Sequence, residues 1–248
     1  MKLNVGIIGC GVIGGALKQW ILEHNPDCNL LVSDPPKGFT DDISGADIYF
    51  INIHILNKPD NTQDISLLQD IIVGLPNKPI IIRTTLVPGT TDSLRKKYNK
   101  NIIFMPEFLR EKSAYDDFCL QPMVFCGEVD LLKEIFVGKK YEVMTSLEAE
   151  IAKFAHNVFC ALKVTFFNGV YELTEQRNCD YEKIRKGLLL SGNINERHTM
   201  VPGHDGKFGY GGKCFPKDVD AFEKYTEDSY LGEMVKIIGM HNDYYREK

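Results

Sequence analysis

The sequence predicts an α/β protein, in which a doubly wound, mostly parallel sheet is followed by a long helix and a small all-α region. In the first part of the chain, short apolar runs alternate with segments of helical spacing, as in strand–helix–strand units. From Leu147 to Arg177 the chain contains no Pro and one Gly, which indicates a single long helix. We therefore expect a sheet domain over residues 1–146, a central helix over 147–178 and a helical region over 179–248.

Composition excludes several classes of protein. The 248 residues are 44% hydrophobic and 25% charged, which is typical of globular chains. A net charge of -5 argues against a general nucleic-acid binder, and no apolar run is long enough for a membrane helix. The seven Cys form no C-x-x-C pair and the His show no metal-ligand spacing. We expect a cytoplasmic protein with reduced thiols, no metal, and no nucleic-acid or membrane partner.

Seven short segments are candidate strands. The first, third and fourth are continuous runs rich in Val and Ile, as expected for strands buried on both faces. Between the strands, helical spacing predicts helices over Val12–His24 and Ile65–Gly74. In chain order, the candidate strands are Asn4–Gly9, Asn29–Asp34, Asp47–Ile53, Pro79–Thr84, Asn101–Met105, Met123–Gly127 and Tyr141–Met144.

From Ser146 onward the sequence predicts helices joined by loops. Ser146 is the expected N-cap of the long helix, since acidic residues follow it in the first turn. Further helices are predicted over Tyr181–Leu190 and Leu231–Arg246, with a Gly-rich loop, Pro202–Gly212, between them. A helix of about 30 residues is much longer than the mean of about 11 to 12, and such helices often bridge domains or form dimers.

A glycine motif follows the first predicted strand. The segment Gly9–Gly14 has the pattern G-x-G-x-x-G and opens a predicted helix, which is the context of a Rossmann-like dinucleotide site. The alternative is an ordinary turn with an unrelated surface Asp. Asp34 ends the next strand, where a carboxylate would accept a ribose 2′-hydroxyl and repel a 2′-phosphate, favouring NAD over NADP. The expected cofactor-binding residues of this turn are Gly9, Gly11, Val12, Ile13 and Gly14.

A second glycine-rich segment, Phe208–Asp218, carries a cysteine. Pro216 suits the first turn of a helix, so Cys214 should lie just before a helix N-terminus. The helix dipole and the nearby Lys213 and Lys217 should favour a thiolate nucleophile there. The alternative, a buried structural thiol, is what we expect for the other six Cys.

These segments resemble the UDP-glucose/GDP-mannose 6-dehydrogenase family. Phe208–Asp218 is similar to that family's active-site cysteine segment, Arg83–Thr91 to its Thr-Pro-Gly-Thr-Thr region, and Pro106–Glu111 to its Pro-Glu-Phe-Leu segment. Glu150–Asn168 and Leu231–Arg246 resemble the helices of its middle region. The resemblance covers nearly the whole chain.

The resemblance implies oxidation of the C6 alcohol of a nucleotide sugar, UDP-glucose above all, to a carboxylate with two NAD. Cys214 would form a thiohemiacetal and then a thioester. The other implied catalytic residues are Lys153, Asn157, Glu107, Glu111, Asp218 and Thr85, with Thr85 and Lys217 also near the cofactor. The implied substrate-binding residues are Phe108, Leu109, Arg110, Glu111, Lys153, Asn157, Arg197, Phe208, Tyr210 and Gly211. Arg197 would reach the neighbouring subunit's substrate, which implies a homodimer formed through the helical region.

Without the resemblance, the spacing of Lys153 and Asn157 would indicate a solvated helix face. Glu107 and Glu111 would then be expected in a surface helix turn. The chain also departs from the family, because it stops before the second Rossmann-like domain that holds much of the nucleotide; a partner protein could supply that domain. His54–Leu56 stands where the family has a Pro-rich loop. Two alternatives therefore stay open: a β-hydroxyacid dehydrogenase, which would need no nucleophilic Cys, and a non-catalytic subunit that binds NAD or a nucleotide sugar.

Overall fold

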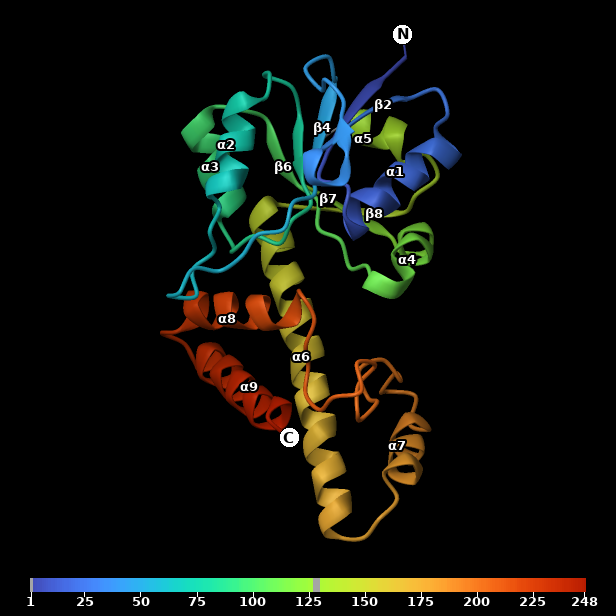
Figure 1. Ribbon diagram of the computed structural model, residues 1–248, viewed down its shortest axis with the longest axis vertical. Coiled ribbons are helices and arrows are strands. Elements are labelled where there is room, and N and C mark those ends of the chain that lie inside the picture. The colour runs from blue at the N-terminus through green and yellow to red at the C-terminus, as the bar shows by residue number, and fades with distance from the viewer. Residues whose placement is uncertain (1, 127–129) are drawn as a thin grey trace. The chain divides into compact units, whose positions relative to one another are not determined.

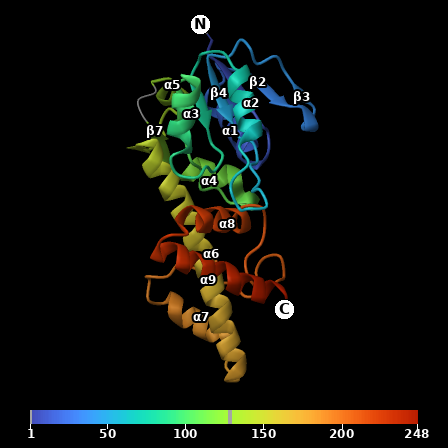
Figure 2. The same cartoon turned by 90° about the vertical axis from the view of Figure 1, so that its left-hand side faces the viewer.

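The computed structural model describes residues 2–126 and 130–248 (Figures 1 and 2). The chain divides into two compact units. Unit 1 comprises Met1–Leu56 and Gln63–Lys153, and unit 2 comprises Asn57–Thr62 and Phe154–Lys248. The short segment Asn57–Thr62 leaves the first unit to join the second, and the division then falls inside the long helix.

Unit 1 is built on a six-stranded sheet with the order β3-β2-β1-β4-β5-β6. All neighbouring pairs are parallel except β2 and β3, which are antiparallel. A second, two-stranded parallel sheet pairs β7 with β8. The strands are β1 (Asn4–Ile8), β2 (Asn29–Asp34), β3 (Phe39–Thr40), β4 (Ile48–Ile51), β5 (Ile80–Ile82), β6 (Ile102–Phe104), β7 (Met123–Cys126) and β8 (Tyr141–Met144).

The predicted fold class is confirmed. All seven predicted strands are present, some shortened by one or two residues at an end, and the final residue of one, Gly127, lies outside the described residues. Strand β3, two residues long, was not predicted. The last two strands form a sheet of their own rather than extending the main one.

Continuous apolar runs produce the core of the sheet. Every residue of β4, β5 and β6 is buried, because helices cover both faces. Helices α2 (Ser66–Gly74) and α3 (Thr90–Tyr98) lie on one side of the sheet (Figure 1). Helices α1 (Val12–His24) and α4 (Ala114–Leu120) pack together on the other side. Unit 1 also contains α5 (Asp130–Ile135) and the 3-10 turns η1 (Pro35–Lys37) and η2 (Glu111–Ser113).

Unit 2 is helical. The long helix α6 (Ser146–Gln176) continues from unit 1 into unit 2, where α8 (Phe215–Thr226) packs against α9 (Tyr230–Arg246). Helix α7 (Tyr181–Leu189) lies on the other side of α6 from this pair (Figure 1). No helix among the described residues is both long enough and apolar enough to cross a lipid bilayer.

Side-chain caps explain where several helices begin. Asp180 accepts hydrogen bonds from the first turn of α7, and Ser229 accepts one from that of α9. The N-cap of α6 lies one residue earlier than the predicted Ser146. Thr145, rather than Ser146, exchanges hydrogen bonds with Glu148, in the reciprocal arrangement of a capping box.

Candidate active site

The glycine turn of unit 1 has the geometry that its motif predicts. It follows β1 at the point where the strand order reverses between β2 and β4, which is where ligands bind in open α/β sheets. Gly9 has φ +81°, and a Cβ on Gly14 would lie 2.0 Å from the Gly9 carbonyl oxygen. Only glycine fits these two positions. Among the described residues outside its own turn, a Cβ on Gly11 would come within 4 Å of the Lys37 ammonium alone, at 3.4 Å, so this glycine leaves the backbone open to a ligand.

Asp34 ends β2 beside the glycine turn. Its Oδ2 accepts a hydrogen bond from the Cys10 N–H at 2.7 Å and lies 3.6 Å from the Lys37 ammonium. Lys37 also donates to the Cys10 carbonyl at 3.1 Å. The carboxylate therefore fixes the turn in addition to lying where a ribose would be recognised.

These residues fit a dinucleotide. Helix α1 begins directly after Gly11, and no side chain among the described residues caps its first amides. Uncapped amides at a helix N-terminus attract a phosphate, and the open Gly11 gives it access. Residues 9, 11–14 and 34 would hold the pyrophosphate and the adenosine ribose.

A buried ion pair lies at the other predicted site of unit 1. The Lys153 ammonium donates to the Glu107 backbone carbonyl at 2.6 Å and lies 3.4 Å from Glu107 Oε1. Both side chains are less than a tenth exposed. Glu107 Oε2 accepts the Leu109 N–H at 2.6 Å, and the Lys153 ammonium also lies over the Phe108 ring. Lys153 and Glu107 are therefore buried, which excludes the alternative that they lie on a solvated helix face and in a surface turn.

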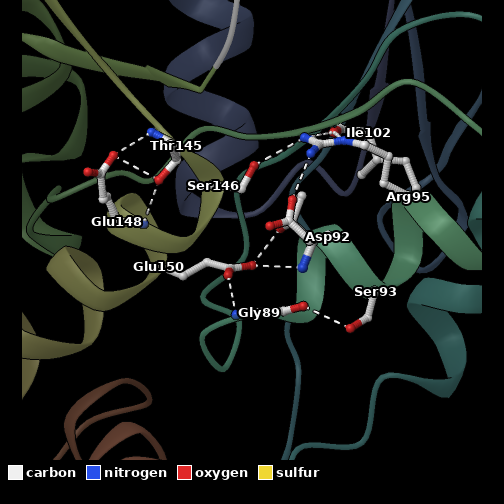
Figure 3. Close-up of polar contacts among 10 residues, drawn as sticks. Gly89, Asp92, Ser93, Arg95, Ile102, Thr145, Ser146, Glu148 and Glu150 are labelled. Carbon is white, nitrogen blue, oxygen red and sulfur yellow. Dashed lines mark hydrogen bonds and ion pairs between the residues drawn. The ribbon is translucent and has the colours of Figure 1, made fainter.

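The loop after β5 carries Thr85, which is buried. Gln63 holds this loop with both ends of its amide, donating to the Thr85 carbonyl at 3.1 Å and accepting the Val87 N–H at 2.8 Å. Glu150 of α6 holds the end of the loop (Figure 3). Its carboxylate accepts hydrogen bonds from the N–H groups of Gly89 and Thr91 at 2.6 and 2.8 Å and from the Thr91 hydroxyl at 2.6 Å.

Glu150 therefore caps α3 from another helix. Gly89 stands at the N-cap of α3 with φ +89° and has no side chain of its own to offer. The Glu150 carboxylate is fully buried, and burial raises its pKa while the hydrogen bonds from α3 oppose that rise.

The other predicted substrate residues of unit 1 are more exposed. Phe108 and Leu109 are half-buried, and Arg110 and Glu111 are exposed. The Arg110 guanidinium binds Asp117 through two hydrogen bonds, at 2.8 and 2.6 Å. This pairing lowers the pKa of Asp117 to about 2 and occupies a guanidinium that the resemblance assigns to substrate.

In unit 2, Cys214 lies where the sequence predicts. It is the exposed N-cap residue of α8, with Pro216 in the first helical turn. Asp218, one turn further on, is completely buried. Its carboxylate accepts a hydrogen bond from the Asn157 side-chain amide at 2.6 Å and forms an ion pair with Lys217. Because Asp218 neutralises Lys217, this lysine contributes less positive charge to the cysteine than the sequence suggests.

The glycine-rich loop before Cys214 is held by two buried amides. Asn168 of α6 accepts the Gly209 N–H at 3.0 Å, and Asn242 of α9 accepts the Tyr210 N–H at 2.6 Å. Gly209 has φ +68°, and a Cβ there would lie 2.6 Å from Asn242 Oδ1. Of the predicted substrate residues here, Tyr210 is buried, Phe208 and Gly211 are half-buried, and Arg197 is exposed.

Each unit thus gathers part of the predicted site: Lys153 and Glu107 in one, and Asn157, Asp218 and Lys217 in the other. Sequence reasoning missed the residues that hold these parts. Asn57 donates to the Lys217 carbonyl at 2.7 Å, and Glu150, Asn168 and Asn242 bind loop backbones. For Glu150, Asn168 and Asn242 the signal in the sequence is a polar residue among apolar ones in a predicted helix, whereas Asn57 lies outside the helices and carries no such signal.

The strand order and the glycine turn define a Rossmann-like α/β fold. Residues 147–244 match the central domain of the UDP-glucose/GDP-mannose dehydrogenase family. A UDP-glucose 6-dehydrogenase of Rickettsia felis is 27% identical over 213 residues, which is 78% of this chain and 46% of the relative. The resemblance inferred from the motifs is therefore confirmed, and the chain spans about half the length of the curated relatives it matches.

Solved structures agree on the fold. A UDP-glucose dehydrogenase from Pyrobaculum islandicum superposes with a TM-score of 0.80 at 23% identity, covering 98% of this chain and 68% of the other. A 3-hydroxyisobutyrate dehydrogenase from Mycobacterium tuberculosis gives a TM-score of 0.72 at 14% identity and covers 99% and 96% of the two chains. At these identities the similarity establishes fold alone.

Proposed function

We propose that the chain oxidises the C6 alcohol of a nucleotide sugar to a carboxylate with two NAD, UDP-glucose being the expected substrate. The observation that carries the proposal is Cys214, exposed at the N-terminus of α8, with the buried Asp218–Asn157 contact one turn away. A simple alcohol dehydrogenase needs no thiol. An enzyme that takes an aldehyde on to an acid through a thioester does, because the thiol is the nucleophile that adds to the aldehyde before the second hydride leaves.

NAD held by the glycine turn and Asp34 would supply the hydride acceptor for each of the two oxidations. The alcohol first loses a hydride and a proton and becomes an aldehyde. The Cys214 sulfur then bonds to the aldehyde carbon, and the oxygen takes up a proton to give a thiohemiacetal. Loss of a second hydride and that proton leaves a thioester, which water cleaves to a carboxylate and the thiol.

The residues of the chain supply the remaining steps. The Lys153 ammonium is a fixed donor for the oxyanion that develops at the reacting carbon, and Asn157, on the same face of α6 four residues later, adds an amide donor. Glu107 accepts a proton from the attacking water during thioester hydrolysis. Thr85 donates to the reacting hydroxyl or to that water, and Asp218 keeps the Asn157 amide oriented.

The other residues would bind substrate or a second copy. Phe108, Leu109, Glu111, Phe208, Tyr210 and Gly211 border the sugar, and Arg197 reaches the substrate of the neighbouring subunit in a homodimer. Arg110 could join them only by leaving Asp117.

The test measures how many NADH are released for each carboxylate formed. Incubation with NAD and millimolar UDP-glucose should release two NADH per carboxylate formed. Cys214→Ser should abolish the carboxylate, whereas Cys179→Ser, the matched variant of another exposed cysteine, should not. Glu107→Gln should slow hydrolysis more than oxidation, so that a thioester on Cys214 accumulates and is seen by mass spectrometry. Full carboxylate production by Cys214→Ser would refute the mechanism.

A β-hydroxyacid dehydrogenase is the second candidate, because it would have the same kind of sheet domain and long helix and would need no nucleophilic thiol. Such an enzyme would also use Lys153 and Asn157 but would stop after one oxidation. One NADH per turnover with a β-hydroxyacid, unchanged in Cys214→Ser, would identify it. Binding of NAD and nucleotide sugar with no NADH from either substrate class would identify a non-catalytic subunit.

A further inference from the structure

The last turn of α9 places an arginine against the glycine-rich loop Pro202–Gly212 of unit 2. The Arg246 guanidinium donates a hydrogen bond to Asp205 Oδ2 at 2.7 Å and another to the Phe208 carbonyl at 3.4 Å. The other carboxylate oxygen of Asp205 accepts the Lys207 N–H at 3.1 Å. The arginine therefore joins two points of the loop to α9.

The same side chain packs on the loop backbone as the chain approaches Cys214. A Cβ on Gly211 would lie 2.8 Å from Arg246 Nη2 and 3.0 Å from its Cζ. A Cβ on Gly209 would lie 3.2 Å from Arg246 Cδ. These distances are shorter than ordinary packing contacts, so the loop passes the arginine this closely only because both residues lack a Cβ.

The ion pair by itself would hold the loop weakly. Surface ion pairs contribute little to stability, and the side chains of Arg246 and Asp205 are 27% and 46% exposed. The hydrogen bond to the loop backbone and the packing on the two glycines add to this attraction. Asn242, one turn earlier on the same face of α9, accepts the Tyr210 N–H at 2.6 Å. Helix α9 thus holds the loop at several consecutive points.

We propose that Arg246 is a positioning residue that, through Asp205 and the glycine-rich loop, fixes Cys214 for its attack on the aldehyde. This role rests on the proposed function, in which the Cys214 sulfur bonds to the aldehyde carbon. Two residues separate Gly211 from Cys214, so a loop that shifts carries the thiol with it. A displacement of about 1 Å can slow a reaction about a hundredfold, and an aldehyde that is not captured leaves the site.

Hydrogen exchange on the full chain tests whether Arg246 fixes the loop. Arg246→Met keeps an unbranched stem but loses the guanidinium, so amides of the peptide 203–213 should exchange at least about fivefold faster than in the wild type. Asp205→Asn, which removes the charge from the other side of the same contact, should also speed this exchange. The double variant should add little to the larger single effect, because both changes break one contact.

Two controls separate a local effect from general destabilisation. In Arg246→Met, the amides of α7 should exchange as they do in the wild type. Lys236→Met, which removes an exposed cation elsewhere on α9, should alter exchange in neither segment. Unchanged exchange of the loop in Arg246→Met, or equally faster exchange in the loop and in α7, would overturn the proposal.

The ratio of products tests whether the loop positions Cys214. At saturating UDP-glucose, Arg246→Met should lose aldehyde before the thiol adds to it, so that clearly more than two NADH are released per carboxylate. Arg246→Lys, which keeps the charge but not the planar group over Gly211, should lie between wild type and Arg246→Met. A merely structural role would reduce the amount of active protein and leave the ratio at two, as we expect for Lys236→Met.

The two measurements fail in distinguishable ways. Faster exchange of the loop with an unchanged ratio of NADH to carboxylate would refute the role of Arg246 in positioning Cys214, and the proposed function would stand. Hydrogen exchange needs no turnover. Absence of NADH from the wild type would therefore refute the proposed function, while the exchange rates would still decide whether Arg246 fixes the loop.

Discussion

Asp34 is the residue on which we expect the choice between NAD and NADP to depend. Its carboxylate stands at the end of β2 beside the glycine turn, where a 2′-phosphate would meet a negative charge. We expect NADP to bind at least about tenfold more weakly than NAD, as measured by calorimetry. Asp34→Ala should narrow the difference in affinity between NAD and NADP. Lys37, which then loses its ion-pair partner, would be free to attract the 2′-phosphate. Asp27→Ala, at an exposed acid outside the turn, should leave the preference unchanged. Equal affinity for both cofactors in the wild type would contradict the prediction.

His198 should make stability depend on pH. Burial, and then the nearby Lys163, lower the pKa of His198 to about 4 from its usual 6.5. The unfolded chain therefore takes up a proton at a higher pH than the folded chain does, so stability falls as the pH drops from about 6.5 to about 4. His198→Asn should lose this part of the dependence, since Asn tolerates the local φ of +62°.

Melting temperatures at pH 4.5 and 7.5 measure this effect. The matched control is Asn193→Ala, at an exposed residue that does not titrate, which should melt with the same pH dependence as the wild type. If His198→Asn also keeps the wild-type difference between the two pH values, the assignment to His198 is wrong.

Individual site residues were predictable where a motif fixes a backbone requirement. Gly9 and Gly14 are needed by the turn, and Cys214 is placed by the proline that follows it. The ion partners were not predictable. Lys217 pairs with Asp218 and Arg110 with Asp117, because these contacts depend on how loops fold back, and no periodicity in the chain encodes that.

At the scale of elements, helices with an apolar stripe or a clear start signal were predicted well. Helix α1 begins and ends at the predicted residues, α9 begins one residue earlier than predicted, and α6 differs from the predicted Leu147–Arg177 by one residue at each end. Helix α3 was missed because its nine residues contain one aliphatic side chain, Leu94, and so carry no apolar period. Its start is set by a carboxylate that lies far away in the sequence.

The prediction for the elements concerns Glu150, the carboxylate that caps α3. Glu150→Gln should destabilise unit 1 by about 2 to 3 kcal/mol, because an amide nitrogen would face an N–H donor of α3 in a fully buried site (Figure 3). Thermal or urea unfolding measures the loss. Glu148→Gln is the matched control, since the Glu148 cap is exposed and should cost about 1 kcal/mol or less. Equal losses in the two variants would contradict a special role for Glu150.

At the scale of the molecule, the order of strands and helices followed from the sequence, but the division into units did not. The segment Asn57–Thr62 belongs to unit 2 although the chain on both sides of it belongs to unit 1. The Asn57 side chain makes this attachment by donating to α8. A hydrogen bond between residues 160 positions apart leaves no trace in local composition, so only the folded structure reveals it.

The long helix supplies the last prediction, a homodimer. Phe159, Phe166 and Leu173 recur every seven residues along α6, so they share one face of the helix, and they are 64%, 58% and 52% exposed. A second copy packing on this stripe would remove large apolar side chains from water. Light scattering should therefore give twice the mass of the chain at micromolar concentration. Phe166→Glu should shift the protein to monomers by placing a charge in the apolar contact, whereas Leu120→Glu, at an exposed apolar residue of unit 1, should leave the dimer intact. A wild-type protein that scatters as a monomer would refute the dimer, and with it the proposed reach of Arg197 into a neighbouring subunit.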